Sequence, residues 1–257
     1  MGIYKAEAVV LRSRVYGEAD RILSLFTKEW GKISAIAKGV RKPTSRLRGA
    51  VQLFSHTHLV LYKGKTLDTI TQGEAAEDFS FLQGDLERLA AASYCAELVE
   101  RLTFENQPLP KLFWLLLKAL RTLRWGDPAL IVRVFEAQLS VILGYRPQLD
   151  CCVVCGQRRQ ALPPDSRERF VFWFSVEKGG MVCPCCAAET PGVRPVSPAA
   201  IEAMAYFLRT PLDKAVRVKL TDGCRAELAS LLRSFLSYHS DVVLRSWEFF
   251  DEMPKNI

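Results

Sequence analysis

The chain has 257 residues, of which 49% are hydrophobic and 25% are charged, so it can form one large folded domain or several small ones. Its longest apolar run, Leu112 to Leu117, is far too short to cross a bilayer, and its first residues lack the apolar core of a signal peptide. We therefore expect a globular cytoplasmic protein rather than a membrane or secreted one.

The net charge of +7 is concentrated near the N-terminus. Residues 1–80 hold 13 basic and 8 acidic residues (13 − 8 = +5), whereas the remaining 177 hold 22 and 20 (22 − 20 = +2). Such a concentration indicates a polyanionic partner, most simply nucleic acid. A charge run by itself is more often a solvated face, so this alternative stays open.

The first 75 residues have the pattern of a small β-barrel. Alternation over residues 4–13, with Ala6, Ala8 and Val10 on one face, predicts a first strand. Further strands are expected over residues 21–27, 32–37, 54–62 and 67–72. The segment Lys38–Gly49 holds five bases among glycine and proline residues and is predicted to be an adaptable loop. An OB fold matches this pattern best, and an SH3-like barrel is the second choice.

From Leu82 onward the hydrophobic period is helical. Helices are expected from residue 82 to a Pro-rich break at residues 107–110, over 111–124 and 127–143, and again after Ser197-Pro198 and Thr221-Asp222. The prediction is an α+β multi-domain protein in which a five-stranded OB-fold barrel precedes an α-helical bundle domain with an inserted zinc-ribbon-like module. The predicted boundaries are 1–80 for the barrel, 81–147 and 191–257 for the helical domain, and 148–190 for the module.

The module is inferred from two CxxC pairs, Cys152/Cys155 and Cys183/Cys186, which are 27 residues apart. Each short turn can direct two thiolates at one tetrahedral Zn²⁺, and four such ligands leave no open position for water. We therefore predict one structural Zn²⁺ that stabilises a substructure too small for its own core. Cys151 and Cys185 are expected to be bystanders, although either could substitute as a ligand. Two disulfides or a redox CxxC are weaker alternatives.

Nothing in the sequence indicates catalysis. It has no Walker loop, dinucleotide fingerprint or nucleophile elbow, and no His-x-Glu triplet of the zinc deaminases. His56 and His58 share a face of a predicted strand without a carboxylate at ligand spacing, so packing or surface roles are favoured. We expect a protein without enzymatic activity.

Several stretches resemble the RecO family of bacterial recombination mediators and DNA repair proteins. They are residues 5–12 (KAEAVVLR), 17–21 (GEADR), 39–49 (GVRKPTSRLRG), 143–149 (LGYRPQL) running into Cys152–Gly156, and 179–183 (GGMVC). The resemblance covers the barrel, the helical region and the cysteine module in order. Cys151 and Cys185 depart from the pattern.

The resemblance implies a protein that binds single- and double-stranded DNA, anneals complementary strands and, with RecR, helps RecA displace the single-strand-binding protein SSB. The expected location is the cytoplasm, at the nucleoid. The basic residues predicted to contact DNA are Arg12, Arg14, Arg21, Lys32, Lys38, Arg41, Lys42, Arg46 and Arg48. Tyr16 or Phe54 could stack on bases, although core packing is favoured for Phe54.

A tail of SSB, acidic and hydrophobic, would need an apolar pocket with a positive rim. The candidates for that rim are Lys118, Arg121, Arg124 and Arg133. Two functions of other classes remain open at this stage: a zinc-ribbon subunit of a nuclease or RNA-modifying enzyme, and a protein–protein adaptor. Metal-dependent turnover on nucleic acid would separate the first from the RecO reading.

Overall fold

The computed structural model describes residues 2–159 and 172–240, which form two compact units. The first lies within residues 2–128 and the second within residues 129–240, and each is treated by itself. The predicted break at residue 80 falls inside the first unit, because the first two helices group with the barrel. The four predicted domain boundaries remain predictions. In the described part of the chain, no helix combines the length and hydrophobicity needed to cross a membrane.

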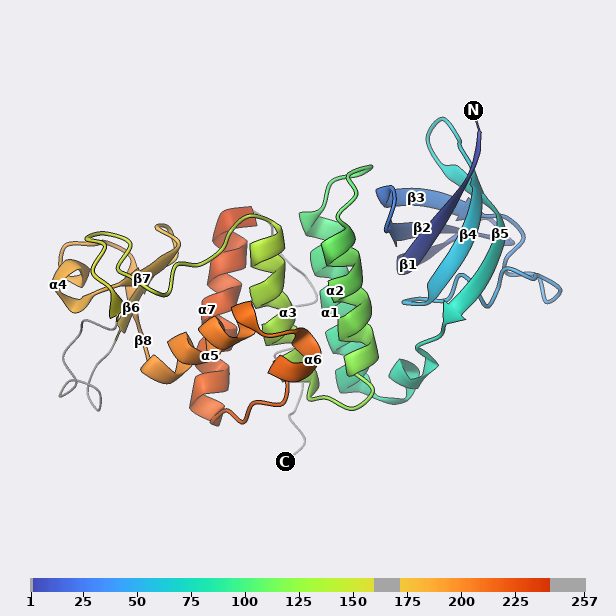
Figure 1. The fold of residues 1–257 in the computed structure, drawn as a ribbon. Coiled ribbons are helices and arrows are strands. Elements are labelled where there is room, and N and C mark those ends of the chain that lie inside the picture. The colour runs from blue at the N-terminus through green and yellow to red at the C-terminus, as the bar shows by residue number, and fades with distance from the viewer. Residues whose placement is uncertain (1, 160–171, 241–257) are drawn as a thin grey trace. The chain divides into compact units, whose positions relative to one another are not determined.

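The predicted five-stranded barrel is confirmed. It is closed in the order β1-β2-β3-β5-β4, with the ends β1 and β4 also paired (Figure 1). All pairs are antiparallel except β3–β5, which is parallel and has only two partner pairs, Ala35↔Asp68 and Ile36↔Thr69. The strands are β1 (Ile3–Tyr16), β2 (Asp20–Thr27), β3 (Gly31–Ala37), β4 (His56–Tyr62) and β5 (Asp68–Glu77).

The interior of the barrel follows the predicted alternation. Ala6, Ala8 and Val10 of β1 are buried in the core cluster. The opposite face of β1 is also buried, since Val9 is 0% and Leu11 is 5% exposed. Helix α1 (Leu86–Leu102) packs against β1, which explains why both faces of this strand are apolar.

The first unit also contains the short helix η1 (Ser80–Gly84) and α2 (Pro110–Thr122). The predicted helix from residue 82 is therefore divided in two, because Asp85 is extended and its side chain accepts a hydrogen bond from the backbone N–H of Arg88. Helix α2 begins with a proline at its first turn, and eight of its side chains are buried. It packs against α1.

The second unit combines helices with a small sheet. The sheet has the order β7-β6-β8 and is antiparallel, and β8 carries it past the predicted module boundary at residue 190. Ser197 caps α5 as its sequence predicted, accepting a hydrogen bond from the N–H of Ala200. The elements are α3 (Pro128–Ile142), β6 (Phe172–Ser175), β7 (Gly180–Val182), α4 (Pro184–Ala187), β8 (Val193–Val196), α5 (Pro198–Arg209), α6 (Leu212–Ala215) and α7 (Asp222–Ser240).

Candidate nucleic-acid interface and metal centre

The segment between β3 and β4, residues 38–55, is called the basic loop. Its backbone is fastened to the β1–β2 turn: the N–H of Gly39 donates to Asp20 Oδ1 at 2.7 Å, and the N–H of Arg41 donates to the carbonyl of Ala19 at 2.9 Å. The Arg41 side chain adds a bond from Nη1 to the carbonyl of Glu18 at 2.8 Å. These bonds fasten the start of the loop to the β1–β2 turn, and the adaptability of its side chains remains a prediction.

Arg48 fixes the loop from within. Its Nη2 donates to the carbonyls of Arg41 and Lys42 at 3.0 and 3.1 Å. Its own carbonyl accepts a hydrogen bond from Nε2 of Gln52 at 2.7 Å. These bonds cross between the two halves of the loop, so Arg48 positions the loop's other cations as well as adding charge.

A cavity of about 380 Å³ lies between the basic loop and the first two strands, and we call it the basic pocket. Arg21 enters it from β2 and donates through Nη1 to Ser13 Oγ at 3.0 Å. The lining residues are Ser13, Arg21, Val40, Arg41, Arg48, Val51, Gln52 and Leu53.

Of the nine residues predicted to contact DNA, Arg21, Arg41 and Arg48 line this pocket. The side chains of Arg12 and Arg14 alternate with Ser13 along β1 and therefore face the other side of the strand. Arg12 is exposed and lies 4.0 Å from Glu100, a loose surface ion pair. Five loop cations, Lys38, Arg41, Lys42, Arg46 and Arg48, are exposed.

Lys32 is not placed for a phosphate contact. Its Nζ donates to the carbonyls of Glu100 and Thr103 at 2.5 and 2.6 Å, at the C-terminal end of α1. Burial lowers the pKa of Lys32. Its cation thus satisfies helix-end carbonyls that have no partner within the helix. We remove Lys32 from the expected DNA contacts, because its charge serves the packing of α1 on the barrel.

The two aromatic residues predicted as stacking candidates differ in exposure. Phe54 is 3% exposed and packs in the interior, as favoured from the sequence. Tyr16 is 55% exposed at the end of β1, beside the turn that holds the basic loop. Tyr16 is therefore the aromatic side chain that remains available for a base.

The four cations predicted for an SSB tail have different environments. Lys118 is exposed on α2. Arg121 is bound to Glu77, and the guanidinium of Arg124 lies 4.5 Å from the centre of the Phe81 ring. Arg133 in α3 is 5% exposed and pairs with the buried Glu136 at 3.1 Å. Because it is buried, Arg133 is withdrawn from this prediction.

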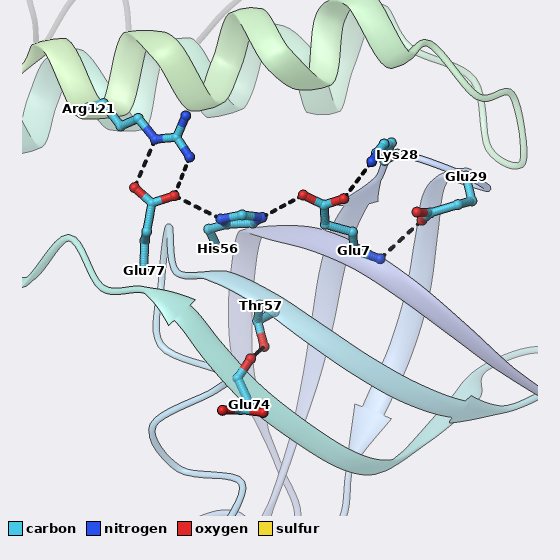
Figure 2. A network of polar contacts seen from close by, with 8 residues as sticks. All are labelled: Glu7, Lys28, Glu29, His56, Thr57, Glu74, Glu77 and Arg121. Atoms are coloured by element: carbon cyan, nitrogen blue, oxygen red, sulfur yellow. Dashed lines mark hydrogen bonds and ion pairs between the residues drawn. The ribbon is translucent and has the colours of Figure 1, made fainter.

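A polar network joins the barrel to α2, and its histidine was assigned no carboxylate partner from the sequence (Figure 2). His56 is 6% exposed, and its Nε2 and Nδ1 lie 3.0 Å from carboxylate oxygens of Glu7 and Glu77 respectively. Burial would raise the pKa of Glu7, but hydrogen bonds from Lys28 and His56 outweigh it and the pKa is lowered. Arg121 holds the pKa of Glu77 at about 2. His58, the second predicted histidine, is exposed.

The four predicted zinc ligands converge. The sulfurs of Cys152, Cys155, Cys183 and Cys186 all lie within 4.8 Å of one another. Gly180 of β7 permits this arrangement, since a Cβ there would be 2.5 Å from the carbonyl oxygen of Gln148 and 2.6 Å from Val153 Cγ1. The turn bearing the first two cysteines can therefore lie directly against β7, which leads into Cys183.

The electrostatics of the cluster suit a cation. Burial would raise the pKa of Cys152, but the backbone N–H groups of Cys155, Cys183 and Val154 donate hydrogen bonds to its sulfur. These bonds outweigh burial and lower the pKa to about 6. Hydrogen bonding to Cys183 raises the pKa of Cys186 to about 12, so the crowded thiols do not ionise together. A divalent ion would stabilise the deprotonated form of four cysteines at this spacing and reduce the repulsion between them. The four cysteines can therefore hold a metal ion.

These observations define a class: an α+β protein with an OB-fold barrel that carries a basic loop, and a helical unit that carries a four-cysteine metal-type module. Sequence comparison identifies the family. The model described as "Recombination protein O N terminal" matches residues 1–79, and "Recombination protein O C terminal" matches residues 83–248. The chain belongs to the RecO family of DNA repair proteins.

Relatives named DNA repair protein RecO match nearly the whole chain. One from Pelotomaculum thermopropionicum is 42% identical over 251 residues, covering 98% of this chain and 94% of the relative. One from Desulfitobacterium hafniense is 42% identical over 250 residues, covering 96% and 89%. One from Desulforamulus reducens is 37% identical over 256 residues, covering 100% and 97%. The resemblance inferred from sequence motifs is thus confirmed, and with it a role in DNA repair.

Proposed function

We propose that this chain is a DNA-binding recombination mediator without catalytic turnover. It binds single- and double-stranded DNA through the barrel, anneals complementary strands and, together with RecR, helps RecA load onto DNA coated with SSB. The observation that carries the proposal is the group of exposed cations on the basic loop, which lies around the basic pocket on an OB-fold barrel. Membership in a DNA repair family supports it.

The arrangement fits affinity for a phosphate backbone rather than for a base sequence. The cations lie on a loop that is fastened to the β1–β2 turn, so their spacing is set before DNA arrives. Each phosphate neutralised releases counterions, which makes binding dependent on salt. Two strands neutralised on one surface repel each other less, and this would promote annealing.

For the SSB tail we propose α2, where Lys118 and Trp114 are four positions apart on one helix face. The Trp114 side chain is 44% exposed and offers apolar area beside a cation. We further propose that the four cysteines hold one Zn²⁺ that stabilises the module. The tight cluster of sulfur ligands supports this, because four protein ligands are typical of structural zinc.

The decisive experiment is a salt titration of DNA binding. In the double variant Lys42→Glu/Arg46→Glu we expect weaker binding to single strands of unrelated sequence. The salt slope, which is the slope of the logarithm of the binding constant against the logarithm of the salt concentration, should become shallower by about 1.4, or about 0.7 for each lost phosphate contact. Arg41 and Arg48 are left intact because they hold the loop's shape.

The matched control reverses two other exposed lysines, Lys65→Glu/Lys111→Glu, which changes net charge equally. Its salt slope should stay at the wild-type value. Equal slopes in the two double variants would mean that the basic loop is an ordinary solvated face and does not bind DNA. Strand annealing should fall with affinity, while metal content should stay constant.

A further inference from the structure

The basic pocket differs from the rest of the cationic surface because it combines charge with a recessed apolar part. Leu53, which is 43% exposed, supplies most of the apolar surface that a ligand can reach, whereas Val40 and Val51 belong to the barrel core and are only 3% and 4% exposed. Polar groups of Ser13 and Gln52 and three arginines complete the lining. A bare phosphate needs no apolar contact, so the cavity fits a ligand that has both an anionic and an apolar part.

The three arginines are held before any ligand arrives. Arg21 donates to Ser13, Arg41 to the carbonyl of Glu18, and Arg48 to carbonyls of the loop. A guanidinium has five N–H donors in a planar fork, so one or two structural bonds leave donors that can meet a phosphate. Its flat face can also stack on a nucleobase.

We propose that the basic pocket binds one unpaired nucleotide of a DNA strand, with the base against the apolar lining and its phosphate on the arginines. The proposal rests on the DNA-binding function proposed above and deepens it. The volume of about 380 Å³ is within the range of about 300–1,000 Å³ typical of small-ligand sites. A base in a duplex is paired and stacked and cannot enter, so the pocket favours single strands.

The surroundings favour a nucleic-acid chain over an acidic protein segment. The basic loop carries further exposed cations outside the cavity, at Lys38, Lys42 and Arg46. They suit a nucleic-acid strand, because such a strand has a phosphate at every nucleotide. Tyr16 is exposed beside the turn that carries the loop and can stack on a neighbouring base. A short acidic protein segment could occupy the cavity but would have no use for these further cations.

The test fills the pocket without changing charge. Ser13→Phe introduces an aromatic side chain on a strand, where it is well tolerated. Ser13→Ala is the control for the lost bond to Arg21, because it removes that bond but leaves the cavity open, so the difference between the two variants reports the filling of the cavity alone. A second control, Gln72→Phe, adds the same ring at an exposed position of β5. Binding is measured at one salt concentration to an oligothymidylate, to a duplex of equal length and to an acidic, hydrophobic peptide.

We expect Ser13→Phe to bind the single strand about tenfold more weakly than Ser13→Ala does, while duplex affinity changes less than about twofold and Gln72→Phe stays near wild type. Equal loss for single strand and duplex, or no loss for either, would overturn the pocket proposal while DNA binding stands. Loss confined to the peptide would make a protein segment the occupant. If the wild-type protein binds neither the oligothymidylate nor the duplex, the proposed DNA-binding function and the proposed nucleotide pocket are both wrong.

An independent readout does not depend on how Ser13→Phe folds. A strand with 2-aminopurine at single positions becomes more fluorescent where that base leaves its stacked neighbours. Since the lining of the pocket is aliphatic rather than aromatic, a base bound there should not be quenched. Wild-type protein should brighten the probe several-fold at one position of a saturated short strand. Uniform fluorescence at every position would contradict the proposal.

Discussion

Glu77, the last residue of β5, accepts hydrogen bonds from two nitrogens of Arg121 in α2, with a distance of 2.8 Å between Arg121 Nε and Glu77 Oε2 (Figure 2). The pair joins the barrel to a helix that begins 33 residues later in the sequence (110 − 77 = 33). The side chains of Arg121 and Glu77 are 46% and 34% exposed respectively, so solvent screens the attraction between them. Arg121 therefore has a structural role before any partner is considered.

Glu77→Gln should lower the free energy of unfolding by about 1 kcal/mol at neutral pH, because an exposed but bidentate ion pair is lost. The wild-type contribution is fully present above the ordinary pKa of 4.5 and is lost as the pH falls toward about 2. Denaturant unfolding at several pH values should show the two proteins converging in that window. A constant difference down to pH 2 would contradict this assignment.

Because Arg121 holds α2, the SSB proposal is tested at Lys118 instead. Lys118→Glu should weaken binding of an acidic, hydrophobic peptide by about tenfold and leave thermal unfolding near wild type. Lys111→Glu, on the same helix, is the charge-matched control. If both variants bind the peptide as the wild type does, α2 is not the docking site.

Lys32, at the start of β3, and Lys38, directly after its last residue, should respond in opposite ways. Lys32→Met removes two charge-assisted bonds to α1 carbonyls and should cost about 2 kcal/mol of stability without altering DNA affinity. Lys38→Met should weaken DNA binding and leave stability unchanged, because Lys38 is exposed. Chemical denaturation and a DNA titration on both variants check this. A loss of DNA affinity in stable Lys32→Met would restore Lys32 to the interface.

Gly31, the first residue of β3, has a φ of +71°, and a Cβ there would be 2.1 Å from the carbonyl oxygen of Gln107. Gly31→Ala should cost about 3 kcal/mol, since left-handed strain and a backbone clash act together. Gly17→Ala is the control: its φ is +58° but nothing lies within 4 Å of a Cβ. It should cost only about 1 kcal/mol. Equal melting temperatures for the two variants would contradict the close approach.

The cysteines can be separated by metal analysis. If the four cysteines hold one Zn²⁺ as proposed, Cys152→Ser and Cys186→Ser should each lose that ion and the order of the module within residues 148–190, because a structural metal supplies folding energy to a substructure this small. Cys151→Ser and Cys185→Ser should retain both. The barrel's unfolding transition should survive in all four variants. Full zinc content in Cys152→Ser would refute the ligand assignment.

Local patterns in the sequence predicted much of this fold. Alternation over residues 4–13 located β1 and its core face, Ser197 marked the start of α5, and CxxC spacing selected the four cysteines that cluster. Each of these signals involves neighbours in the chain, where helix and strand periods and turn chemistry act directly. The family motifs also predicted the order of the barrel, the helical region and the cysteine module along the chain.

Partners that are distant in the chain could not be predicted in this way. His56 lies between carboxylates 49 and 21 positions away, and Lys32 reaches carbonyls 68 and 71 positions away. Arg133 looked like a surface cation but is buried beside Glu136. Composition counts a charge without its partner, so half-buried cations were assigned to DNA or to SSB although tertiary packing already uses them.

The parallel seam between β3 and β5 has two residue pairs, whereas β2 and β3 share seven. A barrel opens where fewest hydrogen bonds must break, so transient opening should begin at this seam, and its amide hydrogens should exchange with solvent before those of β2. The basic loop leaves β3 and enters β4, which lie on either side of β5, so it crosses the end of the seam. A ligand that bridges this loop to β1 and β2 would therefore make transient opening of the barrel rarer, in addition to binding its surface.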